Sequence, residues 1–209
     1  MTNAAAMTYD SLVTDISGYT ERRDQAFLDQ IPRFIMLAEN RIASECRGLG
    51  FQRYATFTLN SNIIDKPSRW RETISLSLVN NNEIQYLYER GYEYCRMYSP
   101  NPATTGIPVY YANYDYEHII VVPSPASSYP SELAYYERPE PLSSLNQTSW
   151  TTQYAPQLLL YACLLETAPW LKNDQRIQTW QGLYNAAKGD LENESARRMS
   201  DRSNSRTSE

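Results

Sequence analysis

Histidine is nearly absent from this chain, and its scarcity limits the chemistry available. The single histidine, His118, excludes a metal site built from several histidines and would have to support any Ser-His-Asp triad alone. Strand alternation would place Asp115 and Glu117 on the face opposite His118. We therefore expect a structural histidine, bonded to a backbone group or a tyrosine hydroxyl.

Glycine is also scarce, and its seven copies form neither GxGxxG nor GxxxxGK[ST], so no phosphate-binding loop is evident. Acidic residues are numerous but scattered along the sequence. A pair of carboxylates that converges only in the folded protein stays open as an alternative. We expect no enzyme activity, no catalytic residues, no cofactor and no metal.

Cysteine and long apolar runs are few. The three cysteines, Cys46, Cys95 and Cys163, are odd in number and lack a CxxC spacing, which predicts buried thiols rather than disulfides. The sequence has neither an eighteen-residue apolar run nor an N-terminal signal pattern, so we expect a soluble protein that is not secreted. A net charge of −5 argues against general nucleic-acid binding through a basic face.

The most apolar stretch of the chain spans residues 155–169. Pro156 suits a first helical turn, and Pro169 prevents the helix from running on. Only three residues between them are clearly polar, so this helix is apolar on every side and must be surrounded. About eleven residues at ~1.5 Å each fall short of a bilayer core of about 30 Å. We therefore expect a helix at the centre of the core.

Helical patterns lie on both sides of this stretch. A capped helix is predicted over residues 8–17, ended by Gly18, and Asp24 is the next capping candidate. Apolar residues then recur at helical spacing over 27–46, with a kink or a fresh start at Pro32. Near the other end a narrow apolar seam predicts a last helix, with its members at Ile177, Trp180, Tyr184, Ala187 and Leu191.

Between the helical blocks the periodicity changes to two. A short helix is expected over 91–98, and strands are expected over residues 51–59, 70–79, 83–89, 108–112, 117–122 and 132–138. Ile74, Leu76 and Leu78 should share one face of their strand. The following Asn80-Asn81-Asn82 predicts a tight turn, because Asn tolerates positive φ.

These patterns predict an α+β fold: a helical bundle built from the N- and C-terminal blocks, with an inserted antiparallel β unit. We assign residues 1–50 and 149–195 to the bundle, 51–148 to the β-rich, tyrosine-rich unit, and 196–209 to a polar C-terminal arm. Residues 195–209 have too little apolar area for a core, so we expect them to be disordered when alone.

Tyrosine and arginine are abundant. Twelve of the 18 tyrosines lie between Tyr86 and Tyr136, and sixteen of the 19 basic residues are arginine. Both residue types are enriched at protein interfaces, where lysine is depleted. A GC-rich genome and an ordinary β-rich core would produce the same bias, so composition alone leaves both explanations open.

Several phrases, in order along the chain, resemble one protein family. They are TYDSLV at 8–13, FLDQIPRFIMLAENRI at 27–42, KPSRWRET at 66–73, GYEYCR at 91–96, GIPVYYANYD at 106–115, YYERPEPL at 135–142, YAPQLLLYA at 154–162 and WQGLY at 180–184. Together they are similar to the head-to-tail adaptor (connector) proteins of tailed bacteriophages, especially short-tailed ones. The similarity runs from about Thr8 to about Leu191.

This resemblance implies a structural virion protein at the head-to-tail interface of the portal vertex, made in the host cytoplasm. Its copies would form a ring, usually a dodecamer, under the portal protein, extend the DNA channel and dock tail or nozzle proteins. An acidic chain suits phage DNA that must slide through without sequence-specific binding. No membrane partner is implied. The alternatives are a tail-completion or stopper protein that closes the channel, and a cytoplasmic enzyme of α+β fold.

Two sets of contact residues follow as hypotheses. The basic residues of the C-terminal arm are expected to bind the portal: Arg197, Arg198, Arg202 and Arg206. Tyrosines of the inserted unit are expected at the contact with other subunits or with the tail: Tyr110, Tyr111, Tyr114, Tyr116, Tyr135 and Tyr136.

Overall fold

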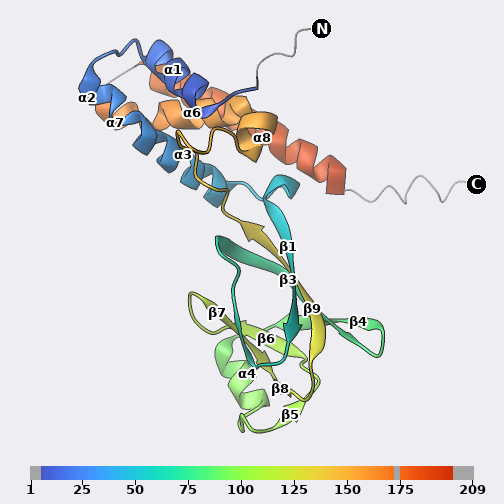
Figure 1. Ribbon diagram of the computed structural model, residues 1–209. Coiled ribbons are helices and arrows are strands. Elements are labelled where there is room, and N and C mark those ends of the chain that lie inside the picture. Colours follow the sequence, from blue (N-terminus) through green and yellow to red (C-terminus); the bar gives the residue numbers. More distant parts are fainter. Residues whose placement is uncertain (1–5, 172–174, 200–209) are drawn as a thin grey trace, which may run out of the picture. The chain divides into compact units, whose positions relative to one another are not determined.

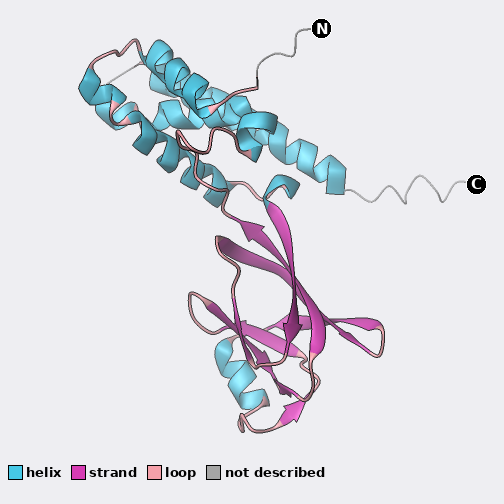
Figure 2. Ribbon diagram, viewed as in Figure 1, coloured by secondary structure: helices cyan, strands magenta, loops and turns pink. Residues whose placement is uncertain are grey.

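The computed structural model describes residues 6–171 and 175–199. Its contacts divide the chain into two compact units (Figure 1). Unit 1 combines Met1–Phe51 with Arg138–Glu209, and unit 2 is the continuous segment Gln52–Glu137. Helices build unit 1, and a sheet with one helix builds unit 2 (Figure 2). The predicted α+β fold, with a β insertion between two helical blocks, is confirmed.

The first helix of unit 1 is α1 (Tyr9–Thr20), which begins at a capping box around Thr8. It runs through Gly18 and ends at Glu21, whose φ of 57° is left-handed. The expected end at Gly18 is therefore wrong. The last turn stays helical because Thr20 is buried and its hydroxyl donates to the Ile16 carbonyl at 2.7 Å.

The next two helices follow the predicted signals. Asp24 caps α2 (Gln25–Leu28), and its carboxylate accepts from the Phe27 N–H at 3.3 Å. A fresh helix, α3 (Ile31–Glu45), then carries Pro32 in its first turn, where a missing N–H costs nothing. One face of α3 is buried, through Ile31, Phe34, Ile35, Ala38, Ile42 and Ala43.

The central helix of unit 1 is α6 (Pro156–Glu166), which follows α5 (Trp150–Tyr154) and precedes α7 (Ala168–Leu171). It packs against α1, α3, α5 and α8 (Arg176–Met199). It buries Leu158, Leu159, Leu160, Ala162, Cys163, Leu164 and Leu165, as expected for a helix that is apolar on every side. An ion pair of 2.6 Å between Arg41 of α3 and Glu166 fixes its last turn.

The last helix is longer than the apolar seam. Trp180, Tyr184 and Leu191 are buried on α8 as predicted, but the helix continues to Met199. Disorder from residue 195 is therefore wrong for 195–199, and residues 200–209 lie outside the described chain. Ser195, one turn beyond Leu191, is also buried and continues the seam. It packs closely against Gly48, because a Cβ added to Gly48 would lie 2.7 Å from the Ser195 Oγ.

Unit 2 is organised around a seven-stranded sheet in the order β1-β9-β3-β4-β6-β7-β2. All neighbours are antiparallel except β4 and β6, which are parallel. The strands are β1 (Gln52–Leu59), β2 (Ile63–Asp65), β3 (Trp70–Asn80), β4 (Glu83–Glu89), β6 (Tyr110–Asn113), β7 (His118–Val122) and β9 (Tyr129–Glu137). The helix α4 (Tyr92–Tyr98) and a short parallel pair, β5 (Thr105–Gly106) with β8 (Ser124–Pro125), complete the unit.

The inner face of the sheet packs around one apolar core, to which strands from both ends of the strand order contribute. Its buried members include Leu59 of β1, Leu76 of β3 and Ile119 of β7, and Ile64 of β2 packs against them. A second, smaller cluster seats α4 on the sheet through Cys95, which contacts Ala112, Ile120 and Val122. The sheet thus positions α4 and the β6–β7 hairpin together.

The β3–β4 hairpin confirms the predicted turn and corrects one face. Asn81 and Asn82 have φ of 50° and 64°, and they join the paired residues Asn80 and Glu83. Ile74, however, is exposed rather than buried beside Leu76. The register against β9 shifts between Thr73 and Ser75, so Ile74 is the extra residue of a bulge and leaves the core face.

Candidate interaction surfaces

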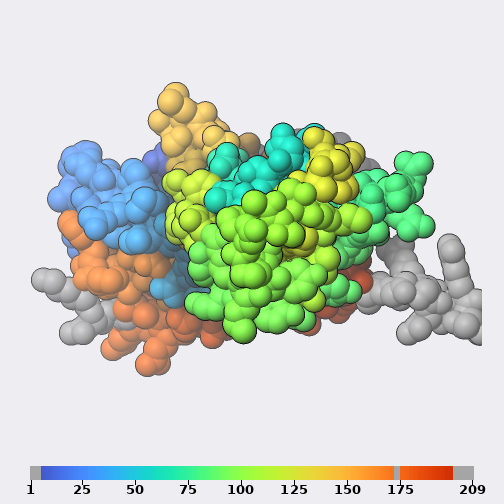
Figure 3. All heavy atoms as spheres, turned by 90° about the horizontal axis from the view of Figure 1, so that it is seen from below, coloured from blue at the N-terminus to red at the C-terminus, as the bar shows by residue number. Residues whose placement is uncertain are grey.

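Tyrosine rings cluster where α4 packs beside β6. We call these rings together the tyrosine surface, and they form two contact groups: Tyr88, Tyr94 and Tyr98 around Tyr110, and Tyr92 with Tyr114. In Figure 3 the residues of α4 and its flanking segments, in green, cover much of the face turned to the viewer. Four of the rings belong to residues that the sequence hypothesis did not name. Helical spacing would have revealed two of them, since Tyr94 and Tyr98 lie four residues apart on one helix.

Tyr110 is the centre of the larger of these two groups. Its ring meets Tyr94 and Tyr98 edge-on, with centroids 5.3 and 4.8 Å apart, and lies 6.3 Å from Tyr88. A hydrogen bond with Tyr94 raises the pKa of the Tyr110 hydroxyl, which keeps it uncharged. These contacts hold the rings in fixed positions, so these side chains lose little conformational entropy when a partner binds.

Two arginines lie over these rings. The Arg90 guanidinium is 5.8 Å from the ring centroids of both Tyr94 and Tyr110, and Arg96 is 5.2 Å from that of Tyr92. The Arg96 Nε also donates to the Tyr92 hydroxyl at 3.0 Å. Stacked arginines and tyrosines are the residue types that contribute most to protein–protein affinity.

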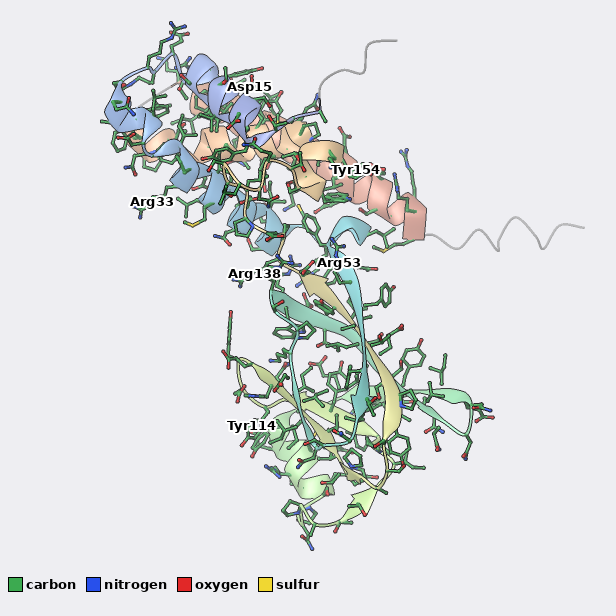
Figure 4. The ribbon with its side chains drawn as sticks, viewed as in Figure 1. Asp15, Arg33, Arg53, Tyr114, Arg138 and Tyr154 are labelled. Atoms are coloured by element: carbon green, nitrogen blue, oxygen red, sulfur yellow. The ribbon has the colours of Figure 1, made fainter. Side chains whose placement is uncertain are left out.

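The structure separates the six tyrosines named from the sequence. Tyr111 and Tyr135 are buried in the core of unit 2 and present no surface, and burial raises the pKa of Tyr111 to about 12. Tyr110 and Tyr136 are half-buried, with the Arg71 guanidinium 5.3 Å from the Tyr136 ring. Tyr114, labelled in Figure 4, and Tyr116 are 41% and 77% exposed. Contact with a partner thus stays a hypothesis for the exposed members.

His118 lies at the end of the β6–β7 hairpin, bonded to carboxylates. Its Nδ1 is 2.7 Å from Asp115 Oδ2, and its Nε2 is 3.4 Å from Asp65 Oδ1. Asp115 Oδ1 also accepts from the N–H groups of Glu117 and His118, each at 2.7 Å. The expectation that Asp115 faces away from His118 is wrong, because residues 114–117 turn instead of continuing the strand.

The contact with Asp115 shifts the pKa values of both partners. Its hydrogen bond to Asp115 raises the pKa of His118, and the same bond lowers the pKa of Asp115. The carboxylates around the imidazole therefore favour its protonated form. Within 6–171 and 175–199, no three His, Cys, Asp or Glu side chains are placed to hold a metal ion.

A hollow in unit 1 lies beside the last turns of α8. Trp150, Tyr154, Leu191 and Ser195 line it, and its volume is about 350 Å³. The Trp150 ring makes tilted contacts with Phe51 and Tyr154, with ring centroids 5.2 and 5.7 Å apart, and these contacts hold it in place. Tyr154, labelled in Figure 4, is 65% exposed.

The basic residues predicted to bind the portal begin at this end of α8. Arg197 and Arg198 lie in the last helical turn, where positive charge is favourable. Arg198 pairs with Glu194 one turn earlier and lines the hollow. Arg202 and Arg206 lie outside the described residues, so the structure brings only two of the four together.

Comparison with known proteins identifies a family. A family model described as "SU10 adaptor protein" matches residues 7–207 of the chain. No curated protein matches it. In the described part of the chain, no helix is long and apolar enough to cross a membrane.

Proposed function

Because the chain belongs to the SU10 adaptor protein family, a family of phage adaptors, we propose that it is a structural component of the virion at the head-to-tail junction. Its copies form a ring, a dodecamer by resemblance, beneath the portal protein. The ring extends the DNA channel and docks tail or nozzle proteins. The observation that carries this proposal is the family match, which covers nearly the whole chain.

The surfaces of the two units support different binding roles for each unit. The tyrosine surface of unit 2 offers fixed aromatic rings and stacked arginines, which suit a protein partner. We assign it, with Tyr116, to contacts with neighbouring subunits or the tail. The net charge of −5 supports a channel through which DNA slides without being held.

We assign portal binding to the end of α8 and the arm that follows it. Arg197, Arg198, Arg202 and Arg206 carry this role, since the planar guanidinium pairs bidentately with carboxylates on a partner. The hollow beside Trp150 and Tyr154 gives the same surface an apolar component. Charge and apolar area together would make the contact specific.

Mixing the purified protein with portal rings tests this function. Coaxial rings stacked on the portal in negative-stain images are the expected result, and an open lumen distinguishes an adaptor from a stopper. Absence of any assembly on the portal would contradict the proposal.

A truncation identifies the portal-binding segment. Removal of residues 200–209 with Arg197→Ala and Arg198→Ala should abolish co-sedimentation with portal rings, while α8 stays folded. Arg33→Ala is the matched control, because Arg33 is an exposed arginine of unit 1 on α3 (Figure 4). Equal loss of binding in both variants would mean that general charge, not this arm, holds the portal.

A further inference from the structure

One part of the sheet of unit 2 is four strands wide and has two free edges. Across it, Thr58 of β1 pairs with Pro130 of β9, Ser131 of β9 with Leu78 of β3, and Leu78 with Gln85 of β4. β1 is the last strand of the sheet, and β4 pairs with β6 only through Tyr88 and Glu89. In Figures 1 and 3 the β3–β4 hairpin extends beyond the rest of unit 2.

The free edge of β4 presents unused backbone groups. Asn80 and Glu83 flank the two-residue turn and form its closing hydrogen-bonded pair, so residues 84 and 86 direct their N–H and C=O groups away from β3. Tyr88 follows in the same alternation, and its backbone also points away from β3, since its N–H donates to the Val109 carbonyl at 2.9 Å. Ile84 and Tyr86 point the same way and have no backbone partner among the described residues.

The free edge of β1 has the same character. Ser77 turns away from β4 and bonds Glu132 of β9, so residues 131 and 133 of β9 bond β1 through Phe57 and Ala55. The backbone groups of Tyr54, Thr56 and Thr58 therefore point outward. The strand lacks proline and has one charged residue, Arg53, which is paired with Glu137 at 3.1 Å. It carries none of the usual protections of an exposed edge.

The two edges complement each other. Outward-pointing residues of both strands have their side chains on the outer face, where Tyr54, Ile84 and Tyr86 are 65%, 66% and 64% exposed. Strand directions also agree: β1 runs antiparallel to β9, β9 to β3, and β3 to β4. A second copy in the same orientation would thus bring its β1 antiparallel to β4, with outer face beside outer face.

We propose that β4 of one copy pairs with β1 of the next copy, with Tyr86 opposite Thr56 and Ile84 opposite Thr58. The inference rests on the proposed assembly of copies and names the edges that join them. Such a contact is heterologous, because two different edges meet, and its repetition closes a ring when the rotation between copies divides a full turn. Pairing of β1 with β1, or of β4 with β4, would satisfy only two copies.

Disulfide trapping in the assembled full-length protein tests the register. Facing residues of such a pair have Cα atoms about 5.5 Å apart, within the range that a disulfide bridges. Thr56→Cys with Tyr86→Cys should therefore give, after mild oxidation, a ladder of trimers and larger species on non-reducing gels. The native cysteines are all buried, and burial raises the thiol pKa of Cys95 and Cys163, so they remain in place.

Two controls make the result specific. Thr56→Cys with Gln85→Cys should give no ladder, because the Gln85 side chain lies on the other face of β4. Each single cysteine variant should stay uncrosslinked, and strong dimers from either one would overturn the proposal in favour of symmetric pairing. Rings seen by electron microscopy without a Thr56–Tyr86 ladder would overturn the strand pairing alone. Absence of rings in every variant would overturn the proposed function and this pairing with it.

A backbone substitution gives an independent test. Thr56→Pro removes the outward N–H of β1, a position that tolerates proline at a sheet edge, whereas Thr56→Val keeps the N–H. We expect the proline variant to need at least a tenfold higher protein concentration to assemble, and the valine variant to assemble normally. Circular dichroism checks that both are folded, and normal assembly of a folded proline variant would contradict the proposal.

Discussion

The two units differ in what they bury and in what they leave exposed. Unit 1 surrounds an aliphatic helix, α6, and ties α3 to its neighbours with polar contacts such as Arg41–Glu166 and the Tyr184 hydroxyl donating to Glu45 at 3.0 Å. Unit 2 also has an aliphatic core, yet four of its tyrosines, Tyr54, Tyr86, Tyr88 and Tyr116, are at least 60% exposed, against one described tyrosine of unit 1, Tyr154.

This difference separates two uses of apolar area. In unit 1 most of the largest side chains contribute to folding, because they are removed from water within the subunit. In unit 2 a cluster of aromatic rings is held in place but not covered. Stability should therefore depend most steeply on unit 1, and assembly most steeply on unit 2.

The largest effect is expected in the middle of α6. Leu159 is fully buried, so Leu159→Ala should lower the free energy of unfolding by about 2–5 kcal/mol through lost contacts and a residual cavity. Urea denaturation measures it. Leu145→Ala is the control, since Leu145 is 98% exposed and its loss should change stability by less than about 0.5 kcal/mol. Similar losses in both variants would show that α6 is not the core.

A second effect concerns a carboxylate inside unit 1. Burial raises the pKa of Glu39 from 4.5 to about 7, although its oxygens accept the Leu142 N–H at 3.2 and 3.3 Å. The folded state then binds the proton more tightly than the unfolded chain. The stabilisation that comes from this tighter proton binding at Glu39 is complete below pH 4.5 and is lost as the pH rises through 7.

Glu39→Gln should therefore raise the free energy of unfolding at pH 8 by about 1–3 kcal/mol and leave it nearly unchanged at pH 4. Denaturant melts across this pH range provide the measurement. Glu192→Gln, a change at an exposed site on α8, should not alter the pH profile. An unchanged slope in Glu39→Gln would mean that the carboxylate is solvated.

A third prediction addresses the tyrosine surface directly. Tyr94→Ala removes an edge-on ring contact with Tyr110, so the fold should lose only about 0.5–1.5 kcal/mol. Binding to the neighbouring subunit or the tail should fall by tenfold or more, as sedimentation would show. Tyr19→Ala in unit 1 is matched in exposure, at 50% against 43%, and should leave binding unchanged.

The smallest effect is expected at His118. NMR titration should give an imidazole pKa above 6.5, and Asp115→Asn should return it toward that value, because Asp115 is the main cause of the shift. The stabilisation from the charged imidazole is present below pH 6.5 and is lost as the pH rises through the raised pKa. Virions carrying His118→Ala should assemble and infect nearly normally, and intact but non-infectious particles would point to a chemical role.

Local sequence signals predicted the fold well where they agreed with packing. Thr8, Asp24 and Pro32 mark helix starts as expected, and the asparagine turn joins its two strands. The failures lie where a distant contact overrides a local rule. Gly18 does not end α1 because Thr20 is buried, and Ile74 leaves the core because β9 pairs with a bulged β3.

The candidate sites were less accessible to sequence. Alternation could not distinguish Tyr111, which faces the core, from Tyr110 beside it, without knowing which face of β6 is covered. Tyr94 and Tyr110 meet only after α4 folds onto the sheet. The free edge of β4 depends on where β6 stops pairing, which is a property of the sheet and not of either strand.

The insertion of unit 2 between the halves of unit 1 has a consequence for the order of events during synthesis. Unit 2 is a continuous segment, so all of its partners have been translated before α5 leaves the ribosome. The apolar stripe of α3, by contrast, waits for α6, more than a hundred residues later. Nascent chains should therefore form the folded sheet of unit 2 while Phe34, Ile35 and Ile42 are still exposed to solvent or bound by a chaperone. Unit 1 folds last.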